Sequence, residues 1–394
     1  MKDVVILSAA RTPIGTFLGS LASLPAPKLG AAAIRAAVER SGISADQVDQ
    51  VIMGNVLQAG QGQAPARQAA IYGGIPKKAG AITLHKVCGS GLRAVMDASN
   101  GIRAGEWNVV VAGGMESMSQ SPHLMLGSRK GYRMGEIKLV DGMIHDGLWD
   151  PYGNKHMGNC AELCVAEHKF TREDQDGYAL TSYKRAQASI EAGKFNDEIV
   201  TVEVAQAKGD PIKVARDEEP FAAPLDKMSK LRPAFDKNGT VTAANASKIN
   251  DGGAALVVAS AEAAQAAGAK PLVRIIGQGG FAQEPDWFTT APAGAARVAL
   301  ERAGLKVSDI DRWEINEAFA VVAMVTMKEL GIAHDRCNAR GGAVALGHPI
   351  GASGARILTT LIHTLVQEKL HYGCASICIG GGEAVSVVVE NLRI

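Results

Sequence analysis

The chain contains an internal duplication, and this repeat restricts its possible folds more than any other feature of the sequence. A segment that starts at Arg35 aligns with one that starts at Arg297, 262 positions later, and segment 90–95 matches segment 353–358 at an offset of 263. The identical pairs in the first alignment are Arg35/Arg297, Ala37/Ala299, Glu39/Glu301, Arg40/Arg302, Gly42/Gly304 and Asp49/Asp311. A repeat that keeps its register over this distance indicates that one folding unit occurs twice.

Each copy reads as an amphipathic helix, a glycine stop, a polar turn and an apolar strand. Strands that alternate with helices are typical of α/β proteins, in which helices cover the faces of a largely parallel sheet. We expect the two copies to pack about a pseudo-two-fold axis. Corresponding loops of the two halves would then converge, and the reactive residues are expected there.

The first copy is interrupted by a long insertion. In the second copy, strand 375–379 continues through three glycines at 380–382 into strand 384–390, whereas the first-copy equivalent at 109–114 finds its partner only at 254–258. Long insertions in α/β domains are usually functional, although an insertion that only packs is the alternative. The predicted domains are 1–118 together with 249–270, the insert 119–248, and 271–394.

Composition excludes several classes of partner. Lys and Arg number 41 against 40 Asp and Glu among 394 residues, so there is no charge excess for nucleic acid or an anionic membrane. No apolar run is long enough for a membrane span, and the N-terminus does not resemble a signal peptide. Six cysteines are too few for a disulfide framework, so we expect a cytoplasmic location. Their spacing does not match a zinc site, and no metal is expected.

Cys88 lies between a predicted strand and a predicted helix, followed by Gly89-Ser90-Gly91. A thiol at a helix N-terminus feels the positive end of the helix dipole, which predicts a lowered pKa and a nucleophilic thiolate. A buried structural cysteine is the alternative interpretation. The same residues also match a loose dinucleotide-binding pattern, but the acidic residue that such a site needs is poorly placed.

The second copy supplies partners for Cys88. Its corresponding loop, 338–354, carries His348, so a cysteine and a histidine occupy matching loops, as a nucleophile and its base require. Cys378 precedes the glycine turn at 380–382, where backbone amides are available to an oxyanion; a buried strand cysteine is the alternative. Asn316 follows a strand and could either cap the next helix or hold a water.

Four motifs together resemble the thiolase family: Cys88-Gly-Ser-Gly, Asn316-Glu-Ala-Phe, Gly347-His-Pro and Cys378-Ile-Gly-Gly-Gly. The resemblance extends over nearly the whole chain, and segments 146–148, 156–158, 230–235 and 245–247 are most similar to the short-chain biosynthetic acetyl-CoA acetyltransferases. It implies two pseudo-two-fold related domains of βαβαβαββ type, stacked in five α-β-α-β-α layers, with an inserted loop domain.

The resemblance also implies the chemistry, a reversible Claisen condensation of two acetyl-CoA molecules to acetoacetyl-CoA and CoA. Cys88 would carry the acetyl group, activated by His348, and Cys378 would act as the acid and base. A water held by Asn316 would join His348 in one oxyanion hole, and the amides of Cys88 and Gly380 would form a second. No permanently bound cofactor is implied, because coenzyme A thioesters are the substrates.

By the same resemblance, the insert binds coenzyme A and joins two dimers into a homotetramer through an arm at about 119–140. The residues implied to contact coenzyme A or its pantetheine are Leu148, His156, Met157, Phe235, Ser247, Ala318 and Phe319. Three features depart from the family pattern. His85 stands where relatives have Asn, Ser or Thr, and Glu383 where many have an uncharged residue. The stretch Glu218-Glu219-Pro220-Phe221 lacks the arginine that relatives offer to the CoA phosphates.

Other functions remain open on the sequence alone. A degradative 3-ketoacyl-CoA thiolase that accepts longer chains would share the same motifs. A ketoacyl-carrier-protein synthase is disfavoured because it would carry a second histidine in place of Cys378. An NAD(P)-dependent dehydrogenase built on Gly89 and Gly91 is the alternative from another class, and a scaffold without activity is a third possibility.

Overall fold

Each copy of the duplicated unit forms one half of a ten-stranded sheet in the computed structural model, which describes residues 2–394. The strand order is β14-β15-β16-β13-β1-β12-β5-β3-β4, and short β2 pairs with β12. The first half contains β1 (Val4–Arg11), β2 (Gly15–Thr16), β3 (Gln50–Gly54), β4 (Gly80–Leu84), β5 (Val109–Ser117) and β12 (Asn250–Ser260). The second contains β13 (Val273–Ala282), β14 (Arg312–Ile315), β15 (Tyr372–Ile379) and β16 (Glu383–Asn391). Within residues 2–394, the strand pairs that join the two half-sheets are Val5↔Arg274 and Ile6↔Val273.

The order β14-β15-β16-β13 of the second half matches β3-β5-β12-β1 of the first, which has β4 and β2 in addition, and the topology is mixed. In the first half β3 runs parallel to β4 and β5, and in the second β14 runs parallel to β15. The remaining neighbours along the sheet are antiparallel. The prediction of a largely parallel sheet is therefore wrong. In each unit the last strand pairs antiparallel with the preceding strand of the same unit, β12 with β5 and β16 with β15. Only parallel neighbours need a crossover connection.

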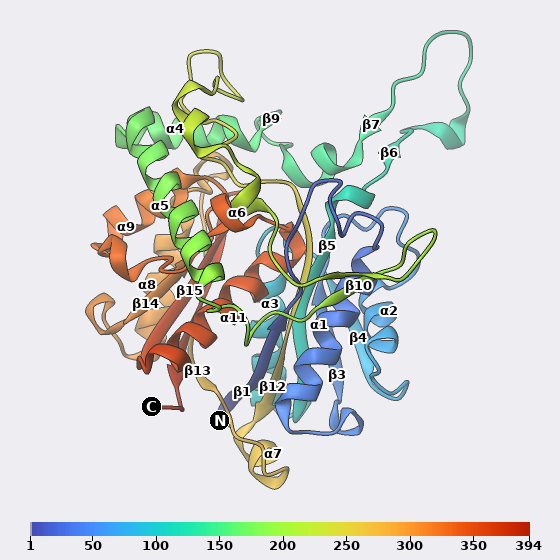
Figure 1. Cartoon of the computed structure of the whole chain (residues 1–394), viewed down its shortest axis with the longest axis vertical. Helices are drawn as coiled ribbons and strands as arrows, with labels where there is room; N and C mark the ends of the chain where they lie inside the picture. Colours follow the sequence, from blue (N-terminus) through green and yellow to red (C-terminus); the bar gives the residue numbers. More distant parts are fainter. Residues whose placement is uncertain (1) are drawn as a thin grey trace.

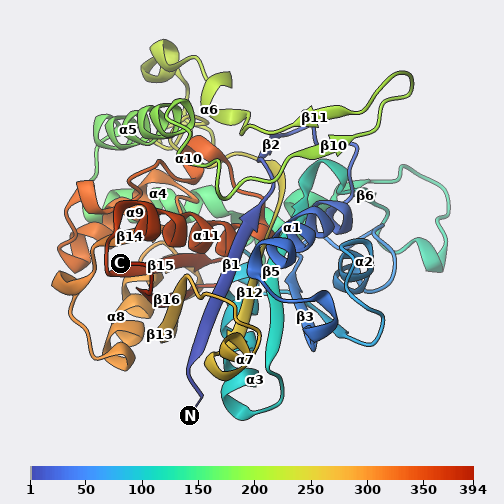
Figure 2. The same cartoon turned by 60° about the horizontal axis from the view of Figure 1, so that its bottom comes forward.

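Helices complete five layers, as predicted. α3 (Ser90–Ala104) and α11 (Ile350–Glu368) contact each other and strands of both half-sheets. α1 (Ala26–Ser41) and α2 (Pro65–Tyr72) cover the outer face of the first half, and α8 (Ala291–Ala303) with α9 (Ala320–Leu330) covers that of the second. Figures 1 and 2 show the blue first half and the orange second half on opposite sides of β1 and β13.

Glycines allow the two central helices to pack closely at the pseudo-two-fold axis. A Cβ atom on Gly91 would lie 2.8 Å from the backbone nitrogen of Ala355, and one on Gly354 would lie 2.4 Å from that of Leu92. Gly91 and Gly354 are equivalent positions of the repeat. Close packing therefore accounts for both glycines of the Gly89-x-Gly91 pattern, since Gly91 faces α11 and a Cβ on Gly89 would lie 2.4 Å from the Ile379 side chain on β15.

The repeated residues make equivalent contacts in the two halves. Gly42 and Gly304 end α1 and α8 in the left-handed conformation, with φ of 78° and 68°, which glycine adopts without strain. Asp49 accepts hydrogen bonds from the backbone of Asn108 and Val109 at 2.7 and 3.0 Å. Asp311 does the same for residues 371 and 372 at 2.8 and 2.9 Å. Each aspartate thus holds the start of the strand that pairs in parallel with the strand following it, β5 beside β3 and β15 beside β14.

The connection between β5 and β12 contains the predicted insert. β5 and β12 pair along their length, from Asp251↔Ser117 to Ala259↔Val109. The elements of the connection are β6 (His123–Leu124), β7 (Val140–Asp141), β8 (Trp149–Asp150), β9 (Lys155–His156), α4 (Met157–His168), α5 (Arg172–Glu191), β10 (Val202–Val204), β11 (Ile212–Val214) and α6 (Glu219–Ala222). The paired strands β6 and β7 support an arm that projects from the molecule (Figure 1).

The remaining elements are short. They are α7 (Ala261–Ala266), α10 (Ala343–Leu346), the 3-10 turns η1 (Ala45–Gln47), η2 (Met118–Gln120), η3 (Ser128–Lys130), η5 (Leu225–Lys230), η6 (Pro285–Trp287), η7 (Val307–Asp309) and η8 (His334–Arg336), and a π-helical turn η4 (Ile144–Leu148). Within residues 2–394, none of the helices has both the length and the apolar character of a membrane span.

Candidate active site

Cys88 sits in a strained turn between β4 and α3. Val87 has a φ of 42°, an unfavourable conformation for a β-branched residue that is found mainly where the surrounding structure enforces it. The Ser90 hydroxyl accepts a hydrogen bond from the Lys86 amide at 2.8 Å and donates one to the Val87 carbonyl at 2.6 Å. The ring of His85 accepts one from the Val87 amide at 3.2 Å. The turn thereby places Cys88, a partly exposed residue, directly before α3.

Two of the residues that depart from the family pattern, His85 and Glu383, support this turn. The imidazole of His85 holds Val87, as described. Glu383, at the start of β16, forms an ion pair with Lys86, the second residue before Cys88. The departures therefore tie the Cys88 turn to its own backbone and to the second half of the molecule.

Cys378 and the glycine turn lie beside Cys88. The backbone amides of Gly380 and of Cys88 itself donate to the Cys88 sulfur. Cys378 is fully buried on β15, and the charge of Cys88 raises its pKa further above the value that burial already imposes. A Cβ atom on Gly380 would touch both Val87 and Met157 at 3.6 Å. Two sulfurs and two amides from opposite halves thus share one location.

Burial raises the pKa of the Cys88 thiol to about 11, and the negative charge of Glu116 adds to this effect although the two amides oppose it. The prediction of a lowered Cys88 pKa is wrong, because the loss of hydration outweighs the helix dipole and the amide hydrogen bonds. Cys88 is consequently a thiol near neutral pH. It can attack a thioester only if a base removes its proton.

His348 has the protonation state of such a base. Its Nδ1 lies 2.6 Å from the Ser353 hydroxyl, which in turn donates to the Pro349 carbonyl at 2.9 Å. Because the Ser353 hydroxyl uses its proton in the bond to Pro349, it can only accept from the His348 ring. Nδ1 therefore carries the ring proton, and Nε2 has the free lone pair. Burial, aided by the charge of Arg356, lowers the pKa of His348 to about 3. No group within residues 2–394 hydrogen-bonds its buried Nε2.

The loop of His348 reaches the surroundings of Cys88. Ile350, two residues after His348, belongs to the apolar cluster of Val56, Leu57, Met118 and Met143 against which Cys88 packs. The Leu148 side chain packs against the same cluster.

Asn316 follows β14 and is completely buried. Neither its amide nitrogen nor its amide oxygen has a hydrogen-bond partner among the described residues. The next helix, α9, begins at Ala320 with Phe319 at its N-cap, so the alternative of a helix cap at Asn316 is excluded. A buried amide that is left unpaired costs free energy, and a water or a substrate group that paired with it would recover that cost.

An aromatic group from the insert and the second half borders Cys378. The ring of His156 stacks on Phe235 with centroids 4.6 Å apart, and Phe235 meets Phe319 edge-on at 5.9 Å. Ala318, Phe319 and Cys378 belong to one apolar cluster, and Met157 and Phe235 pack against it. The amide of Ser247 donates to the Ala318 carbonyl at 2.9 Å. All the residues expected to contact pantetheine, except Leu148, therefore border this cluster.

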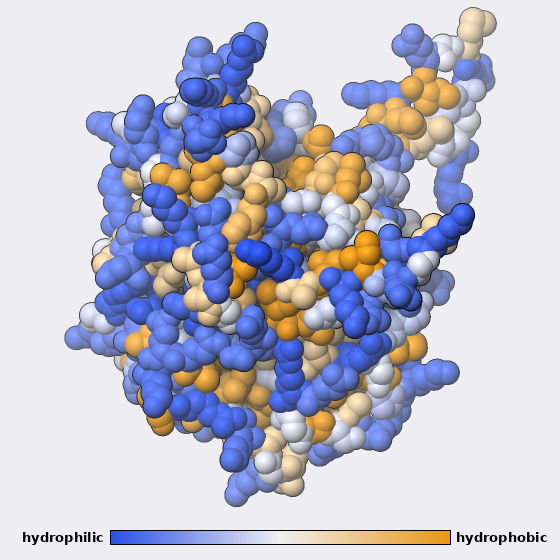
Figure 3. Space-filling view, viewed as in Figure 1, coloured by the Kyte–Doolittle hydropathy of each residue, from blue (hydrophilic) through white to orange (hydrophobic). Residues whose placement is uncertain are grey.

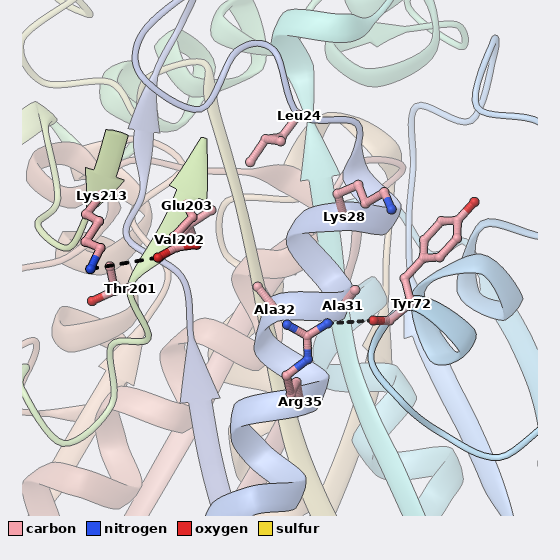
Figure 4. Close-up of a pocket in the computed structure, with 10 residues that line it drawn as sticks. All are labelled: Leu24, Lys28, Ala31, Ala32, Arg35, Tyr72, Thr201, Val202, Glu203 and Lys213. Carbon is pink, nitrogen blue, oxygen red and sulfur yellow. Dashed lines mark hydrogen bonds and ion pairs between the residues drawn. The ribbon is translucent and has the colours of Figure 1, made fainter. Parts of the chain in front are cut away.

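Two other features lie apart from this site. A cavity of about 480 Å³ opens between α1, α2 and the β10–β11 hairpin (Figure 4). Its cations already have partners: Lys28 lies over the ring of Tyr72, Arg35 donates to the Tyr72 carbonyl, and Lys213 is near Glu203. Elsewhere, possible metal-binding atoms of Asp150, Cys160 and Asp286 lie within 4.8 Å of one another. The ammonium group of Lys155 lies 2.8 Å from the Asp286 carboxylate.

Sequence reasoning missed three contributors: Ser353, which fixes the His348 tautomer; Lys86, which pairs with Glu383; and Glu116, whose buried carboxylate lies near Cys88. Glu116 could have been noticed, because it is an acidic residue at the end of an apolar strand. The other two depend on contacts that only the fold creates.

Comparison with known proteins agrees with this geometry. The model of the thiolase N-terminal domain matches residues 4–262, and that of the thiolase C-terminal domain matches residues 269–391. An acetyl-CoA acetyltransferase of Cupriavidus necator is 53% identical, with 99% of this chain and 100% of the relative covered. Acetyl-CoA acetyltransferase 2 of Arabidopsis thaliana is 52% identical, with 99% and 98% covered.

Solved structures are similar as well. The Acat5 thiolase from Ascaris suum, crystallised in complex with coenzyme A, superposes with a TM-score of 0.95 at 43% identity, covering 99% of this chain and 100% of that one. The Bacillus anthracis acetyl-CoA acetyltransferase gives a TM-score of 0.97 at 40% identity, covering 100% and 99%.

Proposed function

Because the chain belongs to the thiolase family, we propose that it is an acyltransferase that joins two acetyl-CoA molecules reversibly into acetoacetyl-CoA and CoA. Full-length relatives at about 50% identity carry the name of this activity. The assignment of the catalytic residues depends on one observation, that Cys88, Cys378 and the Gly380 amide lie close together. Family membership removes the dehydrogenase interpretation.

In the first half-reaction Cys88 becomes acetylated. The Nε2 of His348 takes the thiol proton as the Cys88 sulfur attacks the thioester carbonyl, and the amides of Cys88 and Gly380 stabilise the oxyanion. The carbon–sulfur bond to CoA then breaks, and the leaving thiolate takes a proton from Cys378. The products are acetyl-Cys88, a His348 imidazolium, a Cys378 thiolate and free CoA.

In the second half-reaction the Cys378 thiolate removes a proton from the methyl group of a second acetyl-CoA. The enolate oxygen is stabilised by the His348 imidazolium and by a water that Asn316 holds. The enolate carbon attacks the acetyl carbonyl, and the bond to Cys88 breaks. The Cys88 thiolate recovers its proton from His348, so every group returns to its starting state.

We further propose that residues 119–248 form a coenzyme A-binding domain set between an N-terminal domain (1–118 with 249–270) and a C-terminal domain (271–394). His156, Met157, Phe235, Ser247, Ala318, Phe319 and Leu148 are the proposed contacts for pantetheine and coenzyme A. The aromatic stack beside Cys378 supports this placement. Coenzyme A thioesters are the substrates, and no permanently bound cofactor is needed by the proposed steps.

The proposed assembly is a homotetramer, a dimer of dimers, located in the cytoplasm. The arm of residues 125–139 exposes large apolar side chains, including Met134, Leu126 and Leu139, and Figure 3 shows apolar groups along it. Exposed apolar groups of this kind mark contact surfaces. All six cysteines are free, as suits a reducing compartment.

Mass spectrometry after incubation with acetyl-CoA tests the assignment. We expect an acetyl group on Cys88 in the wild-type chain and none in Cys88→Ala. Cys378→Ala should still be acetylated on Cys88, although more slowly because the leaving CoA thiolate loses its proton donor. It should make no acetoacetyl-CoA, because no thiolate is left to remove the methyl proton of the second acetyl-CoA. An acetyl group found on Cys378 instead of Cys88 would contradict the assignment.

Chain length is tested separately by thiolysis of acetoacetyl-CoA against a 3-ketoacyl-CoA of eight carbons. Faster thiolysis of the shorter substrate is expected. A preference for the longer one would favour the degradative alternative.

A further inference from the structure

Glu116 is a buried carboxylate that the proposed reaction does not use. It lies at the end of β5 with no exposed surface, and both of its oxygens accept two hydrogen bonds. Oε1 accepts from the Asn55 amide group at 2.7 Å and from the Leu57 backbone at 3.1 Å. Oε2 accepts from the backbone of Val56 at 3.0 Å and of Gly351 at 2.9 Å. Burial raises the pKa of Glu116 to about 7, although the four hydrogen bonds oppose this shift. The side chain is therefore ionised over the alkaline range in which Cys88 titrates.

These donors come from the two halves of the molecule. Asn55, Val56 and Leu57 follow β3 in the first half, whereas Gly351 lies in the first turn of α11, three residues after His348. β5 and α11 approach so closely that a Cβ on Gly114 would lie 2.0 Å from the Gly351 carbonyl oxygen. Glu116 sits at this crossing, where its negative charge also meets the positive end of α11.

The backbone that Glu116 holds forms the apolar wall of the nucleophile. Val56, Leu57 and Ile350 belong to the cluster against which Cys88 packs. Two of them donate directly to the carboxylate, and the third precedes the donor Gly351. One side chain therefore fixes the wall around Cys88 and the start of the helix that follows His348.

We propose that Glu116 is a positioning residue for acetyl transfer, which holds the His348 loop of one half against the Cys88 wall of the other. This inference rests on the proposed function. The same carboxylate contributes to the raised pKa of Cys88, so it keeps the nucleophile protonated until His348 receives the proton.

Two substitutions separate position from charge. Glu116→Gln keeps the shape, but its amide group would face two N–H donors instead of accepting from them. Glu116→Asp keeps the charge, but a side chain one methylene shorter cannot reach both Asn55 and Gly351. In both variants we expect the single-turnover rate of Cys88 acetylation to fall about 10- to 100-fold, with the half-saturating acetyl-CoA concentration unchanged.

The pH dependence of Cys88 alkylation distinguishes positioning from a general loss of structure. The midpoint should move down in Glu116→Gln, because the negative charge is gone, and stay near the wild-type value in Glu116→Asp. The other titratable groups around Cys88 are His85, in the same turn, Cys378, on β15, and His348, before α11. Lys86 and Glu383 pair with each other. None of these is altered by the substitutions.

Asp251→Asn is the matched control. Asp251 is a buried carboxylate on the neighbouring strand, and it accepts from Ser119 and not from any of the four donors that hold Glu116. The rate of Cys88 acetylation in the Asp251→Asn variant should stay within about twofold of the wild-type rate. If Glu116→Gln does not fold, Asn55→Ala removes a single donor and should slow acetylation in the same direction by a smaller factor.

The proposal is overturned if the folded Glu116 variants acetylate at the wild-type rate, if only their half-saturating concentration changes, or if Asp251→Asn loses as much activity. A wild-type chain that is never acetylated on Cys88 would instead refute the proposed function. The two failures are therefore distinguishable.

Discussion

Protonation states at single residues determine how this site can work. Cys88 and Cys378 are both thiols at neutral pH, since burial raises the pKa of each. His348 is neutral because burial lowers its pKa to about 3. A neutral base beside a neutral thiol avoids the cost of two buried charges in the resting enzyme. Charge separates only when the substrate carbonyl is present to share it.

Alkylation of Cys88 by iodoacetamide measures this resting state. A pKa of about 11 means that the thiolate fraction, and with it the rate, should rise about tenfold per pH unit between pH 7 and pH 9. Peptide mass spectrometry restricts the measurement to Cys88, with Cys88→Ala as the blank. A rate that is already constant above pH 7 would show that the thiolate is the resting form.

Tight turns at the ends of strands are the elements that create the site. The turn from β15 to β16 brings the Gly380 amide to Cys88, and it needs glycines after that point. Gly382 has a φ of 85°, and a Cβ there would lie 2.3 Å from the Gln283 carbonyl oxygen. The strained Val87 has the corresponding role in the first half. Backbone conformation, more than side-chain identity, directs these donors.

Gly382→Ala should therefore destabilise the protein by at least about 2 kcal/mol, because it combines a left-handed conformation with a steric clash. Chemical denaturation gives the free energy of unfolding. Gly280→Ala is the control, since a Cβ at that strand position meets nothing within 4 Å. Equal stabilities of the two variants would refute the explanation.

At the scale of the whole molecule, the duplication places one set of reactive groups on each half and brings them together at a common axis. The insert adds the arm of residues 125–139 and the aromatic wall beside Cys378. The arm extends away from the body of the molecule (Figure 1). It can therefore make contacts with other subunits without disturbing the site.

If the proposed tetramer forms, at four times the 41.1 kDa chain, replacing residues 125–139 by a short glycine–serine linker should give a dimer that still acetylates Cys88. The exposed apolar side chains that favour association are removed, while the catalytic turns are untouched. Light scattering coupled to size-exclusion chromatography measures the mass. A shortened chain that remains tetrameric would show that the arm is not the contact.

Much of this organisation was predictable from the sequence, because it depends on local pattern and on the repeat. The duplication predicted two equivalent α/β halves and the interruption between β5 and β12, and the resemblance predicted five layers. Cys88 before a helix, His348 in the matching loop and the glycine turn after Cys378 were also found in this way. Each of these features depends on a few consecutive residues, so the sequence alone can reveal it.

Only the tertiary structure decided the rest. It showed that the sheet is mixed, that burial outweighs the helix dipole at Cys88, that Ser353 fixes the tautomer of His348, and that Glu116 joins the two halves. Burial and hydrogen-bond pairing depend on which distant segments meet. A sequence specifies those meetings only through the whole fold, so no local pattern could have revealed them.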